Sequence, residues 1–163
     1  MCSSVQAETI TDKLIVALIE QNTPKVLYEE TKQTWDFGTY DFLVNKAGVV
    51  SFSNAENGIR LTLPIEVIMQ GEVNKDFLGQ KVLLNCKSNF KTDTFLDVTL
   101  LLNPPSSTAN VQISVPIPEV FLFCDGLKLP IQPFLQQLVA EKKAEWEQKI
   151  RSEIQVLLKQ GGI

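Results

Sequence analysis

Hydrophobic and polar residues alternate with a period of two through the middle of this chain. The clearest run is IRLTLPIEVIMQGEV (59–73), where apolar side chains share one face and mostly polar ones the other. An extended segment of that length would span about 50 Å, whereas typical strands have about five or six residues. The run therefore predicts one very long strand, or two strands joined by a kink. Within it, Pro64 and Gly71 indicate a bulge, a bend or an edge position.

Shorter alternating runs predict further strands at about 40–44, 49–53, 81–90, 95–103 and 110–117. Asn57-Gly58 is a strong hairpin signal at the start of the long run. Residues 25–37 have a mixed pattern, which suggests no more than a short strand at 25–29. Together these segments predict an antiparallel meander with one apolar face and one polar face.

Two segments have helical spacing instead. Residues 10–22, ITDKLIVALIEQN, place their apolar side chains on one narrow face, and Thr23-Pro24 ends this predicted helix. A second helix is predicted from about Pro133 to Lys159, about 40 Å long, with one apolar stripe. The stripe consists of Leu135, Leu138, Val139, Trp146, Ile150, Ile154, Leu157 and Leu158.

The predicted fold class is α+β: a long curved antiparallel β-meander wrapped around a long C-terminal α-helix, with a shorter N-terminal amphipathic helix at an end or edge. A sheet of such long strands twists and curls. Its concave side would form an apolar trough, either filled by side chains or open to an acyl chain. Residues 1–9 are predicted to be a flexible segment, and residues 10–163 a single domain.

Composition narrows the function classes. The 163 residues carry a net charge of −4 and include no histidine, so the commonest general base and metal ligand is missing. A mildly acidic chain without a basic stripe argues against nucleic acid as a partner. Cys124-Asp125 is the one tempting reactive pair, but the neighbouring carboxylate would raise the pKa of the thiol. We therefore expect a non-enzyme without cofactor or metal.

The three cysteines are Cys2, Cys86 and Cys124, with no metal-binding spacing among them. A disulfide between Cys86 and Cys124 remains open, although free buried thiols are the favoured interpretation. The first residues, MCSSVQAET, contain no intact signal peptide. They fit either an ordinary cytosolic start or the mature start of a bacterial lipoprotein, whose cysteine carries the lipid.

Two longer phrases carry a resemblance to a known family. They are YDFLVNKAGVVSFSNAENGIRLTLPIEVIMQGEV (40–73) and VPIPEVFLFCDGLKLPIQPFLQQLV (115–139). With the order of helix, meander and long helix, they resemble a module of the tubular lipid-binding (TULIP) superfamily, and uncharacterised bacterial members, often lipoproteins, in particular. Many relatives have two modules, so a fragment, a single-module member and half of a homodimer all stay open here.

The resemblance implies that the chain handles a lipid or another apolar small molecule. It also favours Cys2 as a lipidation site, which would give peripheral membrane association and a periplasmic or membrane-anchored location in the cell envelope. A cytoplasmic location is the alternative.

Two functions are therefore weighed. The first is non-catalytic binding of an apolar ligand between sheet and helix. The second is a structural or assembly protein of the envelope with a filled core and no ligand. Plain core packing is the competing interpretation at every candidate ligand-binding position. Those positions are Ile65, Val67, Met69, Val120, Phe121, Phe123, Leu127, Leu135, Leu138 and Val139. We expect the mouth of any trough beside residues 115–138, with Cys124 in its wall.

Overall fold

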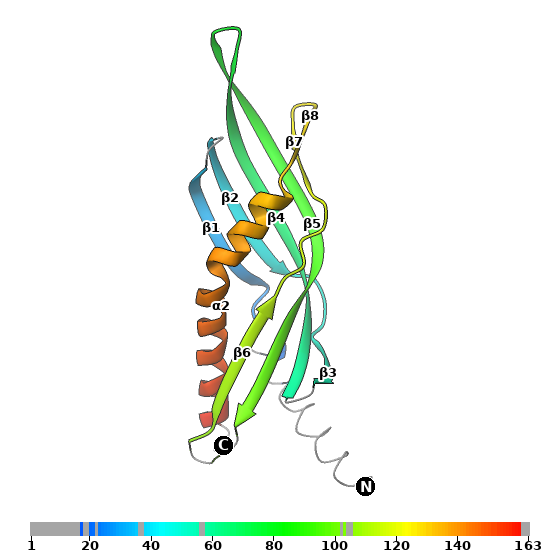
Figure 1. Cartoon of the computed structure of the whole chain (residues 1–163), viewed down its shortest axis with the longest axis vertical. Helices are drawn as coiled ribbons and strands as arrows, with labels where there is room; N and C mark the ends of the chain where they lie inside the picture. The colour runs from blue at the N-terminus through cyan, green and yellow to red at the C-terminus, as the bar shows by residue number, and fades with distance from the viewer. Residues whose placement is uncertain are drawn as a thin grey trace.

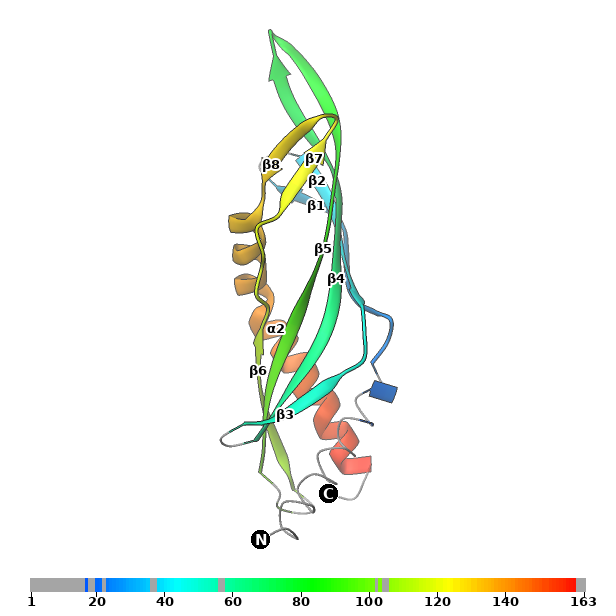
Figure 2. The ribbon, with the colours of Figure 1, turned by 90° about the vertical axis from the view of Figure 1, so that its right-hand side faces the viewer.

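The structure is a computed structural model that describes residues 17, 20, 21, 23–35, 38–55, 58–101, 103 and 106–160. These residues form one 8-stranded antiparallel sheet with a long helix along one face of it (Figures 1 and 2). The elements are β1 (Val26–Trp35), β2 (Gly38–Lys46), β3 (Ser51–Ala55), β4 (Gly58–Phe77), β5 (Gln80–Leu101), β6 (Thr108–Ser114), β7 (Phe121–Cys124), β8 (Leu127–Pro130) and α2 (Gln132–Gln160). The predicted α+β class and curved meander are confirmed for this part of the chain.

The centre of the sheet is the hairpin of β4 and β5. The long alternating run is one strand of 20 residues, without a kink, and β5 has 22 residues. Predicting two strands at 81–90 and 95–103 was wrong, because β5 pairs with β4 without interruption across the gap. The polar residues Ser88 and Thr94 are buried at inward-facing positions of β5. They interrupt the alternation of apolar and polar residues, although the strand itself continues.

Pro64 and Gly71 do not mark a bulge or bend, because β4 pairs continuously with β5 past both. Pro64 lies in the gap where β2 has left β4 and β3 has not yet begun. Its carbonyl accepts a hydrogen bond from the Ala47 N–H at 2.8 Å, so its missing N–H faces this local edge. A Cβ on Gly71 would lie 2.5 Å from the backbone oxygen of Thr39, so the close approach of β2 requires glycine.

The remaining strands flank the central hairpin. The order across the sheet is β1-β2-β4-β5-β7-β8, with β3 also paired to β4 and β6 also paired to β5. The expected strand at residues 25–29 is longer, since β1 runs to Trp35. Ala55 pairs with Gly58, which confirms the hairpin predicted at Asn57-Gly58.

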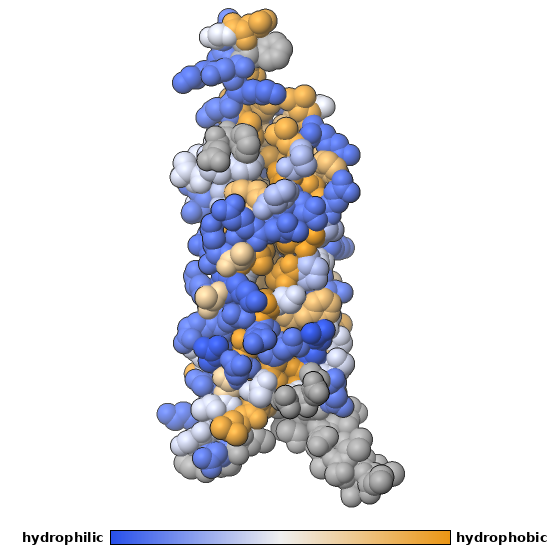
Figure 3. Space-filling model, viewed as in Figure 1, coloured by the Kyte–Doolittle hydropathy of each residue, from blue (hydrophilic) through white to orange (hydrophobic). Residues whose placement is uncertain are grey.

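Helix α2 confirms the predicted C-terminal helix to within a residue at each end. Its apolar stripe faces the sheet: Leu135, Leu138, Ile154 and Leu158 are buried, and Trp146 and Ile150 pack against the same core. The polar side chains of α2 lie on its outer surface, as the space-filling view shows (Figure 3). No helix in the described part of the chain is both long enough and apolar enough to cross a membrane.

An aromatic cluster fills the space between the sheet and the first turns of α2. The ring centroids of Trp35 and Phe134 lie 5.1 Å apart, and both rings contact Tyr40 at 5.7 and 5.6 Å. Aromatic pairs in this range pack favourably at tilted or edge-to-face angles. This end of the trough is therefore closed by side chains from three elements.

Residues 115–131 form the corner between the sheet and α2. Strands β7 and β8 make a hairpin around Asp125-Gly126, both with positive φ (46° and 90°), and β8 is an edge of the sheet. Cys86 and Cys124 form a disulfide with a Cα–Cα distance of 4.2 Å, so the favoured interpretation of free thiols was wrong. Both cysteines are buried, so that interpretation was right about their burial but not about their bonding.

Most of the predicted N-terminal features lie outside the described residues. This holds for the flexible segment 1–9, for Cys2, and for the helix 10–22 apart from three positions. Ala17, Glu20 and Gln21 are helical. The Glu20 carboxylate forms an ion pair with Lys46 and accepts a hydrogen bond from the Val50 N–H at 2.8 Å, which fixes this residue to the sheet.

Candidate functional site

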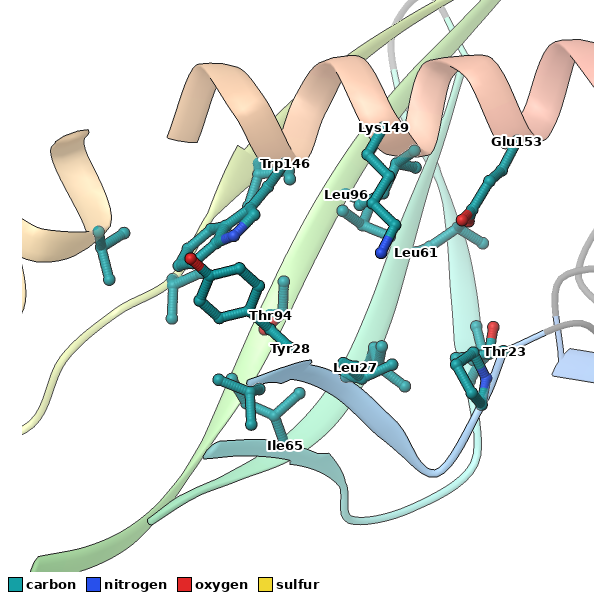
Figure 4. A pocket seen from close by; sticks show the side chains of 18 of the residues that line it. Thr23, Leu27, Tyr28, Leu61, Ile65, Thr94, Leu96, Trp146, Lys149 and Glu153 are labelled. Carbon is teal, nitrogen blue, oxygen red and sulfur yellow. The ribbon is translucent and has the colours of Figure 1, made fainter. Parts of the chain in front are cut away.

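An elongated cavity of about 550 Å³ lies between the sheet and α2. Along the helix its lining runs from Leu135 to Gln160, which is about 38 Å of helix. Figure 4 shows the middle of this space, with α2 on one side and β1 and the central hairpin on the other. Because the volume is modest for such a length, the cavity is narrow.

The walls come from six regions of the chain, and most of their side chains are apolar. The sheet and its connections contribute Thr23, Pro24, Leu27, Tyr28, Phe42, Val44, Val50, Leu61, Leu63, Ile65, Val67, Phe90, Thr94, Leu96, Ile113, Val115 and Ile117. Helix α2 contributes Leu135, Val139, Trp146, Lys149, Ile150, Ser152, Glu153, Ile154, Val156, Leu157 and Gln160. Such a lining suits a hydrocarbon and offers few hydrogen bonds to water.

The few polar groups lie at defined places in this lining. Lys149 and Glu153 extend from α2 toward β1 (Figure 4) and belong to the exposed part of the lining. Pro24, Val156 and Gln160 are exposed as well. The cavity therefore reaches solvent between the start of β1 and the C-terminal half of α2.

The mouth of the trough was expected beside residues 115–138, whereas the exposed lining residues belong to other segments. Val115 and Ile117 line the cavity but are half-buried, and Val120 and Cys124 are fully packed in the core. Cys124 is therefore bonded core and not a wall residue. The prolines of this segment do place it at a sheet edge, but the core beneath it is filled.

A polar cluster adjoins the cavity where β1 meets α2. The Tyr28 hydroxyl donates a hydrogen bond to the Glu30 carboxylate, which also pairs with the Lys142 ammonium at 2.8 Å. The Tyr28 ring packs edge to face on Trp146 at 5.2 Å, and both rings line the cavity. The indole N–H of Trp146 is buried without a hydrogen-bond acceptor among the described residues.

This cluster shifts three pKa values. Burial, with help from the Glu30 carboxylate, raises the pKa of Tyr28 from 10.0 to about 12. Burial also opposes ionisation of Glu30, but hydrogen bonds from Lys142 and Tyr28 outweigh it and lower the pKa of that carboxyl. The hydrogen bond to Glu30 in turn raises the pKa of Lys142. The cluster therefore holds Glu30 charged and Tyr28 neutral at neutral pH.

These shifts predict an unusual alkaline titration. Burial also raises the pKa of Tyr40, and the chain has 2 tyrosines, so native protein should show little tyrosinate absorbance at pH 10. Because both pKa values are raised by folding, the resulting stability is present below about pH 10, the unfolded value, and is lost as the pH approaches 12. An ultraviolet titration of native and urea-unfolded protein measures this directly.

Glu30→Gln is the matched variant for that titration. It removes the acceptor charge that helps raise the pKa of Tyr28 and leaves burial in place, so Tyr28 should ionise at a lower pH than in the wild type. Native tyrosines that ionise near pH 10 in both proteins would contradict the buried Tyr28–Glu30 contact.

The ten predicted ligand-binding residues divide into two groups. Ile65, Val67, Leu135 and Val139 lie together in the wall of the cavity. The other six are not part of it: Met69, Val120, Phe121, Phe123, Leu127 and Leu138. Whether any of the ten binds a ligand stays a prediction.

Two physical causes exclude the second group from the wall. Met69, Val120 and Leu138 are buried in the packed part of the core; Met69 lies opposite Phe42 in the register of β2 and β4. Phe123 and Leu127 are 55% and 43% exposed, so neither is enclosed by the core. Phe121 is half-buried, with the Lys128 ammonium 4.0 Å from its ring centroid.

Sequence reasoning missed the walls supplied by β1, by β6 and by the last turns of α2. Ile150, Ile154 and Leu157 were recognised as an apolar stripe but not as wall residues. Leu27 and Tyr28 had no usable pattern around them. The one available signal was the length of the apolar stripe, which runs from Leu135 to Leu158.

The described residues do not form a metal-binding cluster. Across the described ranges, no three His, Cys, Asp or Glu side chains lie close enough to hold a metal ion. Apart from Tyr40, whose shift comes mainly from burial, the ionisable groups with shifted pKa values are engaged in ion pairs or hydrogen bonds within the fold. The chemistry that the site offers is therefore apolar contact with a few polar groups at its mouth.

Comparisons with known proteins give little further information. No protein-family model matches the chain, and no curated protein matches it. Among solved structures, the chain is similar to a crystal structure of a lipopolysaccharide binding protein, at 15% identity over 94% of this chain and 38% of that one, with a TM-score of 0.33. This chain thus spans little more than a third of that protein. At so low a TM-score we draw no conclusion from the likeness.

Proposed function

We propose that this protein binds a lipid or another apolar ligand in the cavity between the sheet and α2, without catalysing a reaction. The observation that carries the proposal is the open volume of about 550 Å³ with its mainly apolar lining. Ligand pockets for small molecules typically have volumes of about 300–1,000 Å³. Well-packed interiors, in contrast, leave few voids larger than a water molecule.

The shape of the cavity favours one extended hydrocarbon chain over a compact ring system. It is long and narrow, and its walls are aliphatic at most positions. A single acyl chain could lie along α2, with its polar group at the exposed end near Lys149 and Glu153. A ligand oxygen atom beside Trp146 could instead accept a hydrogen bond from the buried indole N–H.

The alternative function, an assembly protein with a filled core, fits the aromatic cluster at one end of the trough. It does not account for the open volume over the rest of its length. The energetic reason is that a void between aliphatic side chains forfeits their dispersion contacts. A scaffold with no ligand would be expected to close it.

We also propose that the chain is a single TULIP-type module that works in an oxidising compartment of the cell envelope. The curved sheet with its long helix supports the first part of this proposal. The buried Cys86–Cys124 disulfide supports the second, because disulfides persist outside the reducing cytosol. Lipidation of Cys2 and a homodimer are further proposals. Replacing Cys2 with Ser behind the native leader should release an anchored protein from membranes, and unchanged fractionation would exclude the anchor.

Native mass spectrometry followed by solvent extraction tests the binding function. A co-purifying lipid, or uptake of a fluorescent palmitate analogue by delipidated protein, is the expected result. Val139→Trp places a large ring in the cavity and should weaken uptake by about tenfold or more, equivalent to at least about 1.4 kcal/mol of lost binding free energy. Val115→Trp should do the same from the opposite wall.

Ala140→Trp is the matched control for the filling variants. Ala140 follows Val139 in the same helix but is exposed, so this variant should take up the analogue like the wild type. Melting temperatures of all variants separate loss of binding from loss of folding. A clean ligand-free mass together with no uptake of palmitate or phospholipid by the wild type would refute the proposal.

A further inference from the structure

The tip of the β4–β5 hairpin projects beyond the rest of the molecule. Strand β2 stops pairing with β4 at Val73, and β7 pairs with β5 no nearer the tip than Cys86. From Asn74 to Leu83 the two strands therefore pair with each other alone, and Figures 1 and 2 show this ribbon standing clear of the domain. Every side chain described in this ribbon is exposed. An isolated two-stranded ribbon is at best marginally stable in water.

The side chain of the apex residue Leu78 is almost completely exposed to solvent. It is 94% exposed, and its φ of 51° places it in the left-handed region, followed by Gly79 at 82°. Two-residue turns with both φ positive favour Asn, Asp or Gly at the first position, whereas leucine there is strained. A large apolar side chain that is both strained and exposed points to a function at the apex.

Two further apolar side chains described in the ribbon, those of Val82 and Leu83, point to opposite faces. Val82 is 39% exposed and Leu83 is 54% exposed. As neighbours in one strand, they point to opposite faces. A flat protein surface could cover only one of these faces. A medium that surrounds the tip on all sides covers both, together with Leu78.

The charges of the ribbon favour an anionic lipid surface as this surrounding medium. Lys75 and Lys81 lie just behind the apex, opposite Val82 and Asp76 in the register, and Asp76 is the one acidic residue from Asn74 to Leu83. The ribbon is thus net basic, although the whole chain carries −4. Lysines in this position can reach lipid phosphates while the apex is buried.

We propose that the β4–β5 tip is a docking site for the surface of an anionic lipid bilayer. Leu78 enters the boundary between headgroups and acyl chains, Val82 and Leu83 follow on both faces, and Lys75 and Lys81 contact phosphates. The ligand cavity lies in the half of the sheet away from this tip. Docking therefore attaches the domain while the mouth of the cavity stays away from the bilayer.

Flotation of the purified protein with vesicles tests this proposal. We expect partition into phosphatidylcholine–phosphatidylglycerol vesicles, severalfold weaker partition into phosphatidylcholine alone, and further weakening with added salt. Leu78→Asn is the decisive variant. Asn-Gly is a favoured sequence for this turn, so the hairpin should keep or gain stability. Vesicle binding should fall about tenfold, the factor expected for losing the burial of one leucine.

Two further variants complete the experiment. Lys75→Gln combined with Lys81→Gln should remove most of the preference for anionic vesicles. Val49→Asn is the matched control. Val49 is 73% exposed and follows Gly48, which lies next to Pro64 and therefore far from the tip. This variant should bind vesicles like the wild type.

The proposal is overturned if the folded wild type binds neither kind of vesicle. It is also overturned if Leu78→Asn binds anionic vesicles as strongly as the wild type. A concentration-dependent dimer that Leu78→Asn abolishes, without vesicle binding, would instead assign the tip to a second copy and equally overturn it. None of these residues lines the cavity, so palmitate uptake is a separate measurement and can succeed or fail independently.

Discussion

Loss of the Cys86–Cys124 disulfide is expected to lower the free energy of unfolding by about 4 kcal/mol. That value follows from the chain-entropy model for a sequence separation of 38 residues. Because a small domain is stabilised by only about 5–15 kcal/mol in total, the urea midpoint of a Cys86→Ala, Cys124→Ala double variant should fall markedly. Both sites are replaced together so that no single buried thiol remains to mispair.

The position of the bond predicts which part of the molecule loosens. Strand β7 pairs with β5 at Cys86↔Cys124 and Lys87↔Phe123, so the disulfide is the main attachment of the β7–β8 hairpin to the sheet. Hydrogen exchange should rise first in this hairpin and in the first turns of α2, and less in β2 and the central part of β4. Uniform loss of protection would indicate that the bond stabilises the whole fold equally.

A thiol count provides the control for the disulfide prediction. The chain has 3 cysteines, so unlipidated, unreduced protein unfolded in urea should react with one equivalent of thiol reagent, at Cys2, and with three after reduction. Three reactive thiols before reduction would show that the bond is absent. The stability difference between the double variant and the wild type should then be close to that of two ordinary buried substitutions.

The strands that the sequence predicts well are those whose inward positions are all apolar. Strand β2 alternates cleanly through Tyr40, Phe42 and Val44, all of them buried. Strand β1 has no such clean alternation, because its pairing with β2 shifts register between Val26 and Tyr28 and again between Glu30 and Gln33. Each shift moves the following side chains to the other face, so no single period fits the whole strand.

The site was predicted less well than the fold because the fold does not decide which part of the trough is filled. Trp35, Tyr40 and Phe134 meet only in three dimensions, and they close one end. Four of the ten predicted ligand-binding residues, Val120, Phe121, Phe123 and Leu127, were placed in the β7–β8 corner, and none of them lines the cavity. The cavity instead continues along α2 as far as Gln160, past Lys149 and Glu153, whose charged side chains interrupt the apolar pattern in the sequence.

Leu122→Ala is expected to be among the most destabilising single substitutions in the chain, at about 3–5 kcal/mol. Leu122 is 0% exposed and does not line the cavity, so its side chain is enclosed by neighbours on all sides. Those neighbours are held in place: the Ile131 N–H donates to the Val120 carbonyl at 3.0 Å, and Cys124 is bonded to Cys86. Such a site cannot collapse around the missing atoms, which places the cost in the upper part of the usual range.

Urea unfolding of Leu122→Ala beside Leu101→Ala measures this cost. Leu101 is 69% exposed, so the same truncation there should change the free energy of unfolding by no more than about 0.5 kcal/mol. Because Leu122 lies outside the cavity, a bound palmitate analogue should stabilise Leu122→Ala and the wild type by equal amounts. A cost below about 1 kcal/mol at Leu122 would contradict the packed corner. Unequal stabilisation by the ligand would show that this corner belongs to the binding site after all.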